Sequence, residues 1–166
     1  MILQIDDWVF DINIDQTMSY SAAEAAEHCE CAYCRNYYGA VDQAYPVLRP
    51  FLTQFGLDIE APDEQMPYDM DGKIYYDSVY MVCGSITQSG ANPIRLGNVL
   101  IRPSIGEGSD HHCPKPNFAL EVESVILPWI LDEPMEETVS PANFPEFLKK
   151  MWDRLLSKFT NNDVQS

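Results

Sequence analysis

Apolar and polar residues follow two different periods along this chain, and the changes of period mark the expected elements. Between Leu3 and Ile14 the apolar residues come in short alternating patches, which is typical of one or two short strands. Residues 21–24 have the form of a capping box, so a helix is expected from about Ser21. Pro46 must end or kink this helix, because proline lacks the amide hydrogen that a helix interior needs.

A second helix is predicted from Val47 to Phe55, where the apolar residues share one face and Gly56 follows as a suitable C-terminal residue. Two stretches are expected to be loops. Residues 61–67 contain two prolines, and residues 106–117 are rich in glycine and proline, which favours an exposed loop.

The middle of the chain changes to a strand pattern. Aromatic and β-branched residues fill 73–76 and 78–86, and residues 96–102 are a shorter candidate. Residues 118–125 alternate between apolar and polar, as a half-buried strand does, so Glu121 and Glu123 are expected on its solvent side. Pro128 should end this strand.

A last helix is predicted from Phe144 to Phe159, with an apolar face that should dock on the sheet, and residues 161–166 form a polar tail. Two early helices, strands in the middle and a C-terminal helix predict an α+β fold with a mainly antiparallel sheet. A chain of 166 residues without a long linker is expected to form a single domain over residues 1–160.

The charge balance bears on partners. Twenty-six acidic residues against ten basic ones give a net charge of −16. Nucleic acids and anionic membranes are not expected partners, because their affinity for proteins comes largely from Lys and Arg. A protein with a basic surface is allowed, although solubility alone also explains the charge. The first seven residues lack a secretory signal, and the longest apolar run, 125–131, is far shorter than the ~20 residues of a spanning helix, so a cytoplasmic location is expected.

The strongest chemical feature is a cluster of three thiols within six residues, Cys29, Cys31 and Cys34, with His28 beside them. Two residues turn about 200° on a helix, so the three sulfurs converge only if a helix begins near Cys31 and Cys29 precedes it. A helix N-terminus at that point would also favour the thiolate form, which binds metals.

Zinc is the cofactor that this cluster suggests, because zinc takes four ligands from Cys and His. The predicted ligands are Cys29, Cys31, Cys34 and His28, with Cys83 or a residue of 110–113 as alternatives for the fourth position. Thiol redox chemistry and plain burial of reduced cysteines remain open as alternatives to metal binding.

The cluster resembles a motif of uncharacterised bacterial proteins, in which Cys-x-Cys-x-x-Cys is followed by a basic or amide residue, Asn and an aromatic residue. The matching residues are Cys29, Cys31, Cys34, Arg35, Asn36 and Tyr37. Residues 55–62 are similar to a phrase in the same proteins. The resemblance implies no activity. Within the motif, Arg35 and Asn36 are candidates to donate hydrogen bonds to the sulfurs.

No phosphate-binding loop or catalytic triad signature is present, so no catalytic residue is assigned. The sequence predicts a non-enzymatic protein-interaction module, for example an immunity-like or antitoxin-like inhibitor that masks a basic active site. The acidic residues 131–139 beside Trp129 are the expected partner contact. The alternative is a small thiol- or metal-dependent enzyme centred on Cys29, Cys31 and Cys34.

Overall fold

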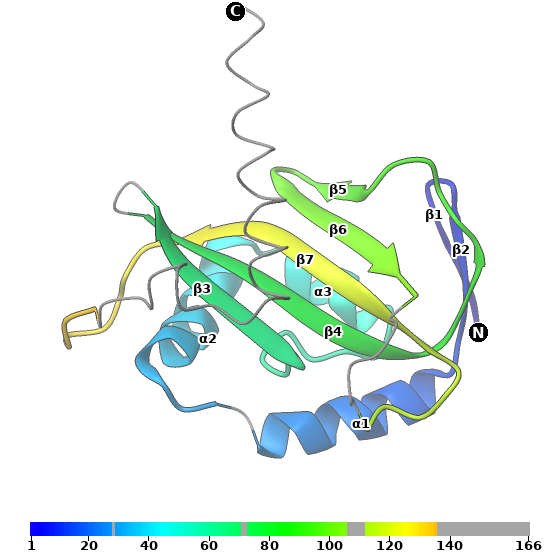
Figure 1. The fold of residues 1–166 in the computed structure, drawn as a ribbon, viewed down its shortest axis with the longest axis horizontal. Helices are drawn as coiled ribbons and strands as arrows, with labels where there is room; N and C mark the ends of the chain where they lie inside the picture. The colour runs from blue at the N-terminus through cyan, green and yellow to red at the C-terminus, as the bar shows by residue number, and fades with distance from the viewer. Residues whose placement is uncertain (28, 71–72, 106–111, 136–166) are drawn as a thin grey trace, which may run out of the picture. The chain divides into compact units, whose positions relative to one another are not determined.

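The structure, a computed structural model, describes residues 1–27, 29–70, 73–105 and 112–135. Ten elements follow one another in this part of the chain (Figure 1): β1 (Ile2–Ile5), β2 (Trp8–Ile12), α1 (Ile14–Ala26), α2 (Ala32–Ala44), α3 (Leu48–Thr53), β3 (Glu64–Met70), β4 (Lys73–Gln88), β5 (Ile94–Leu96), β6 (Val99–Ser104) and β7 (Asn117–Leu127).

The long strand β4 organises the sheet. The strand order is β1-β2-β4-β7-β6-β5, with β3 added on β4, and every pair is antiparallel. The first part of β4 lies between β3 and β7, and its last residues, from Gly84 to Gln88, pair with β2. The predicted α+β class with an antiparallel sheet is therefore confirmed. The two strands predicted at 73–76 and 78–86 are one strand.

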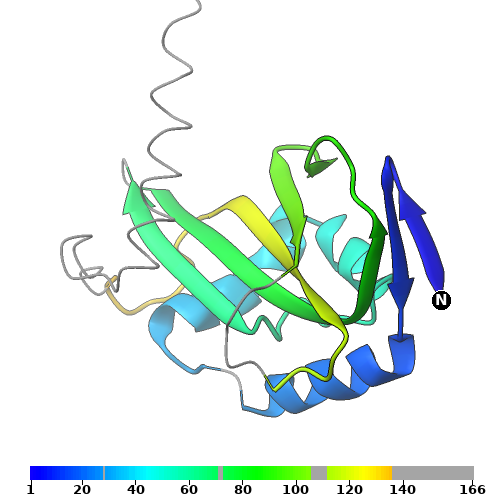
Figure 2. The same ribbon diagram turned by 45° about the vertical axis from the view of Figure 1, so that its right-hand side comes forward.

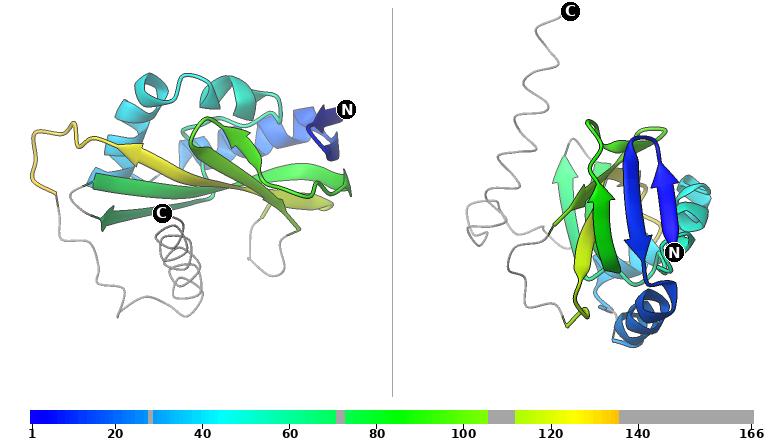
Figure 3. Two further views of the ribbon diagram at one scale, coloured as in Figure 1. Left: turned by 90° about the horizontal axis from the view of Figure 1, so that it is seen from above. Right: turned by 90° about the vertical axis from the view of Figure 1, so that its right-hand side faces the viewer.

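The three helices lie on one face of the sheet (Figures 2 and 3), where α1 packs on β4 and α2 packs on β7. The core between these layers is rich in aromatic rings. Its largest fully buried side chains are Tyr37, Tyr76, Tyr80, Phe10, Phe55 and Phe118. Burying each such ring stabilises the fold by about 1.5–3 kcal/mol, so the aromatic core fixes α2 and α3 against the strands.

The helix predicted from about Ser21 to Pro46 is two helices, α1 and α2, and the first of them begins earlier than predicted. Asn13 caps α1, and its side chain accepts a hydrogen bond from the Gln16 amide at 3.2 Å. Ser21 is buried inside this helix, where its hydroxyl accepts a hydrogen bond from the Asp58 amide at 3.0 Å. The capping box at Ser21 was therefore a wrong interpretation, because Asn13 supplies the cap and Ser21 serves a long-range contact.

The second helical segment agrees with its prediction. Leu48, Phe51, Leu52 and Phe55 are all buried on one side of α3 and the turn behind it. Gly56 has a φ of +83°, a left-handed conformation that suits a glycine after a helix. The chain also leaves α2 at Ala44, just before Pro46.

Two predictions about the strands were wrong. Residues 64–70, expected mostly as a loop, form β3, and Pro67 is tolerated there because β3 pairs on one side only, with β4. Glu123 does not face solvent. Its carboxylate is buried and accepts a hydrogen bond from Arg102 Nε at 2.9 Å, because Arg102 lies on the neighbouring strand β6. Pro128 does end β7 as predicted.

Several predictions fall on residues that the structure does not describe: the helix from Phe144 to Phe159, the polar tail, the domain boundary at residue 160, His28, and half of the loop 106–117. The described end of that loop contains a buried residue, Cys113, so it is not uniformly exposed. Over the ranges that are described, no helix has the length and apolar character needed to cross a bilayer.

Candidate metal centre

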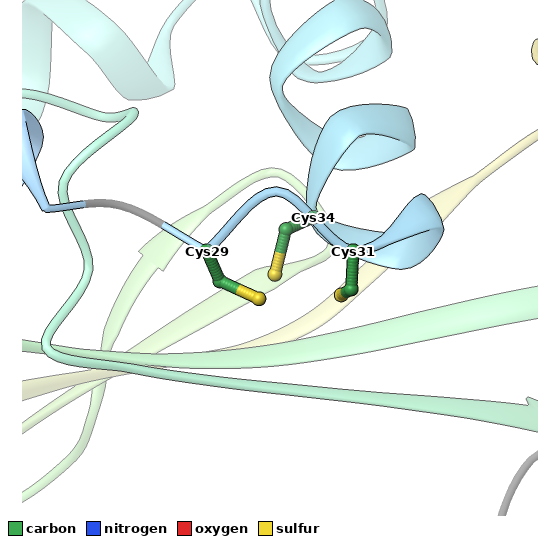
Figure 4. A group of neighbouring side chains, drawn as sticks. All are labelled: Cys29, Cys31 and Cys34. Atoms are coloured by element: carbon green, nitrogen blue, oxygen red, sulfur yellow. The ribbon is translucent and has the colours of Figure 1, made fainter.

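The structure brings the three predicted thiols together. The sulfurs of Cys29, Cys31 and Cys34 all lie within 4.8 Å of one another, beneath the first turn of α2 (Figure 4). A tetrahedral zinc with Zn–S bonds of ~2.3 Å holds its sulfurs about 3.8 Å apart. The three side chains therefore need only small movements to share one ion.

Local backbone geometry explains this convergence. Helix α2 begins at Ala32, and Cys31 is its N-cap with extended backbone angles. Cys29 thus lies outside the helix and turns back toward Cys34, which is the arrangement that the sequence required. Arg35 braces this turn, because its amide donates to the Cys31 carbonyl at 3.0 Å and its guanidinium donates to the Glu30 carbonyl at 2.8 Å.

The thiols have different acidities. The Cys31 amide, and then the Cys31 and Cys34 thiols, hydrogen-bond to Cys29 and lower its pKa below the ordinary value. Burial raises the pKa of Cys34, and the neighbouring thiols Cys31 and Cys29 raise it further. Cys29 and Cys31 are exposed, whereas Cys34 is buried. Without a metal, the cluster therefore has an accessible thiolate-forming Cys29 above a protonated Cys34.

Asn36 has a different role from the predicted hydrogen bond to sulfur. It is fully buried, and its Nδ2 donates to the Tyr76 hydroxyl at 3.0 Å and to the Pro128 carbonyl at 3.1 Å. Its Oδ1 accepts from the Ile130 amide at 2.8 Å. The Tyr76 hydroxyl in turn donates to the Tyr33 carbonyl at 3.0 Å. Asn36 therefore ties the start of α2 to β4 and to the chain that follows β7.

Residues 128–133, which we call the 128–133 segment, lie against the first turns of α2. Arg35 pairs with Glu133, and Trp129 Nε1 donates to the Glu133 carbonyl at 2.7 Å. The Trp129 ring meets Tyr33 edge-on, with ring centroids 5.5 Å apart. The described part of the predicted partner contact and the predicted metal site are thus neighbours in space, although about a hundred positions separate them in sequence. Residues 136–139 of the predicted contact lie outside the described residues.

A glycine permits this close packing. A Cβ added at Gly39 would lie 2.8 Å from Ile130 Cδ1, which is closer than carbon atoms approach one another. Ile130 itself remains 49% exposed. The 128–133 segment therefore presents an apolar side chain to solvent directly over α2.

The remaining candidate ligands lie elsewhere. The Cys83 and Cys113 sulfurs are 3.5 Å apart in the core, so Cys83 pairs with Cys113 and not with the cluster. His112 is exposed, and among the residues described here only Cys29, Cys31 and Cys34 form a group of three or more ligand-type side chains that close together. His28, Asp110 and His111 are outside the described residues.

One residue beside the cluster was missed from the sequence. Tyr38 follows Cys34 by one helical turn on α2, so the two side chains lie on the same face of the helix. Burial, and then Cys34, raises the pKa of Tyr38 above the ordinary value. The (i, i+4) spacing from Cys34 was the available signal, but the many tyrosines of this chain are also explained by packing.

Comparisons with known proteins place no relative beside this chain: no protein-family model, curated protein or solved structure matches it.

Proposed function

We propose that this protein binds one zinc ion through Cys29, Cys31 and Cys34, and that the ion stabilises the contact face of a non-enzymatic protein-interaction module. The observation that carries this proposal is the convergence of the three sulfurs at the start of α2. Soft thiolates select zinc and related thiophilic metals over magnesium and calcium. The positive end of the α2 dipole supports the negative charge that three thiolates bring.

The fourth ligand in this proposal is His28, which directly precedes Cys29 in the sequence. Structural zinc sites have four protein ligands, whereas sites with three keep an open position. A closed site would suit a structural role at the base of the contact face.

The contact face in this proposal consists of the 128–133 segment and the start of α2. Ile130 is exposed there, and Trp129 borders a cavity of about 290 Å³ that Lys73 and Leu127 also line. Exposed apolar and aromatic groups supply most of the energy of protein interfaces, and charge speeds the encounter. With a net charge of −16, the favoured partner is a protein with a basic surface. An immunity-like or antitoxin-like inhibitor belongs to this class.

Three of the described arginines give little support to nucleic-acid binding. Arg35 pairs with Glu133, Arg102 pairs with Glu123, and Arg49 contacts three carboxylates. These guanidinium groups are already neutralised, so they have little capacity to release counterions from phosphates. Five free thiols suit a reducing compartment, and we propose the cytoplasm on this ground.

The second candidate is a small thiol- or metal-dependent enzyme. The exposure of Cys29 and its lowered pKa favour this alternative, since an accessible thiolate is a nucleophile. None of the described cysteines lines the cavity beside Trp129, which gives the interaction module the stronger case.

Metal analysis of purified, untagged protein tests the proposal. We expect about one equivalent of zinc per chain, released when the thiols are alkylated or oxidised. The Cys113→Ser variant is the matched control, because it removes a thiol outside the cluster and should retain the metal. Metal content well under half an equivalent in both proteins, after growth in zinc-supplemented medium, would reject the proposal. Rapid labelling of Cys29 in that metal-free protein would then favour the enzyme.

A further inference from the structure

We propose that Cys83 and Cys113 form a reversible disulfide when a peroxide oxidises one of them, so that oxidation ties the chain before β7 to the strand β4. This inference goes beyond the proposed function, because it needs neither the metal nor the contact face. It assigns a covalent modification to two thiols that lie outside the cysteine cluster.

The two sulfurs are already neighbours. Cys83 Sγ and Cys113 Sγ lie 3.5 Å apart, and both residues are free thiols. A disulfide holds its sulfurs about 2.05 Å apart, so bond formation has to close only ~1.5 Å. A movement of this size is within the reach of side-chain rotation. Met81 and Ala119 surround the pair in a small buried cluster, so the two thiols face each other inside the core.

The backbone holds both cysteines in place. The Cys83 amide donates to Thr17 Oγ1 at 3.1 Å, and the Cys83 carbonyl accepts from the Asn13 amide at 2.9 Å. Asn117 pairs with Cys83 across β4 and β7, and its Nδ2 donates to the Cys113 carbonyl at 2.8 Å. The residue opposite one cysteine therefore fixes the other. Groups that are held together in this way react with a high effective concentration.

The surroundings favour a bond between these two thiols over a second metal site. Within the described ranges, the cluster at the start of α2 is the only group of three or more ligand-type side chains, whereas zinc takes four ligands. Cys83 is fully buried and Cys113 is 4% exposed, so reagents from solvent reach them only when the core opens locally. A partner thiol in the same core needs no such access.

The reaction balances with a peroxide as the oxidant. Cys113 lies outside the strands, so local opening of its segment exposes its sulfur first. The Cys113 thiolate attacks one oxygen of hydrogen peroxide, the O–O bond breaks, and a sulfenic acid forms while the other oxygen leaves as water. After the segment closes, the Cys83 thiolate attacks the Cys113 sulfur and displaces the hydroxyl group as a second water. The two thiols lose two electrons and two protons, and one peroxide becomes two waters. A small dithiol returns the two electrons by thiol–disulfide exchange.

The bond would also change the stability of the fold. It would join residues 30 positions apart and close a loop that contains β5 and β6. A cross-link across a loop of this length restricts the unfolded chain, which favours the folded state. Oxidation is therefore expected to stabilise the protein, and this gives a second readout besides the bond itself.

Peptide mapping of wild-type protein tests the proposal. The protein is reduced, freed of reductant and exposed to hydrogen peroxide, and its remaining thiols are alkylated before digestion with trypsin. Trypsin leaves the thiols in three different peptides: the cluster in 1–35, Cys83 in 74–95 and Cys113 in 96–149. A disulfide inside the cluster stays within one peptide. A link between 74–95 and 96–149 therefore identifies the proposed bond, and we expect it to be the main cross-linked product.

Urea denaturation provides the second measurement. Oxidised wild type should unfold at about 1–2 M higher urea than reduced wild type, and dithiothreitol should remove this shift. Cys113→Ala is the matched control, because it keeps the cluster and cannot form the bond, so its midpoint should not shift on oxidation. The linked peptide is measured in wild type alone, so the test does not depend on how well this variant folds.

Three outcomes would overturn the proposal. Sulfinic or sulfonic acid at Cys113 without the linked peptide would show that the two sulfurs do not meet during oxidation. Links from 1–35 to 74–95 or 96–149 in equal amount would show random pairing. A urea shift of the same size in Cys113→Ala would assign the stabilisation to oxidation of the cluster and reject the role of this bond.

Discussion

The two groups of cysteines in this protein have similar sulfur spacing and opposite surroundings. Cys83 and Cys113 lie 3.5 Å apart, closer than the 4.8 Å limit that encloses Cys29, Cys31 and Cys34. The pair is buried with Met81 and Ala119, and burial raises the pKa of Cys113, with Cys83 raising it further. The cluster has two exposed thiols and a helix N-terminus. Proximity of sulfurs alone therefore does not make a reactive site. Thiols become reactive where water and backbone amides can reach the sulfur and stabilise the thiolate.

The largest expected effect separates the two groups by metal affinity. Cys34→Ser removes a ligand from the cluster and should lower zinc affinity by at least ~10³-fold, since thiolate ligands supply most of the binding free energy of such sites. Cys113→Ser should leave the affinity unchanged. Isothermal titration with a competing chelator measures both. Equal losses in the two variants would mean that the comparison is wrong and that the core pair takes part in binding.

Alkylation of the metal-free protein sharpens the comparison. Cys29 should react first. Cys83 and Cys113 should react at least ~10²-fold more slowly, because their alkylation needs local opening of the core. The sign of the pH dependence follows from the lowered pKa of Cys29. Its thiolate persists as the pH falls below the ordinary thiol pKa, so its rate declines only at lower pH than that of an unfolded control peptide. Mass spectrometry of peptides after timed labelling gives each rate.

A cysteine of the core pair labelled as fast as Cys29 would overturn this prediction. A Cys29 rate whose pH midpoint equals that of the peptide would show that the Cys31 amide does not act on it.

The smallest of these effects concerns how the cluster is held. Asn36→Ala removes a fully buried side chain with three hydrogen bonds and should lower the free energy of unfolding by about 2–4 kcal/mol. Arg35→Ala is the control, because its ion pair with Glu133 is half-exposed and contributes ~0–1 kcal/mol. Urea denaturation measures both values.

Hydrogen exchange localises the change in Asn36→Ala. Protection should fall at the amides of residues 129–133, whereas the amide of Cys83, which donates to Thr17 Oγ1 at 3.1 Å, should keep its protection. Loss of protection at Cys83 alone would show that Asn36→Ala destabilises the strand β4 near Cys83 and not the 128–133 segment, which would contradict the prediction.

Local sequence patterns were sufficient to predict part of this structure. The convergence of three sulfurs followed from helical rotation, and β7 followed from its alternation and Pro128. Ser21 was misread because its hydroxyl serves a residue 37 positions away. Asn36 was underestimated because its role depends on what packs around α2, and neither propensity nor spacing specifies contacts over 94 positions. The partner and the fourth ligand stay predictions.

The distance in sequence between Asn36 and Ile130 also has a consequence during translation. A ribosome needs roughly 5–20 s to add the 94 residues that separate them. Until β7 is complete at Leu127, the nascent chain presents Cys29, Cys31 and Cys34 without the strand that later packs on α2. Zinc that binds at this stage would preorganise the first turn of α2, and chaperones and oxidants would meet the same thiols in their most accessible form.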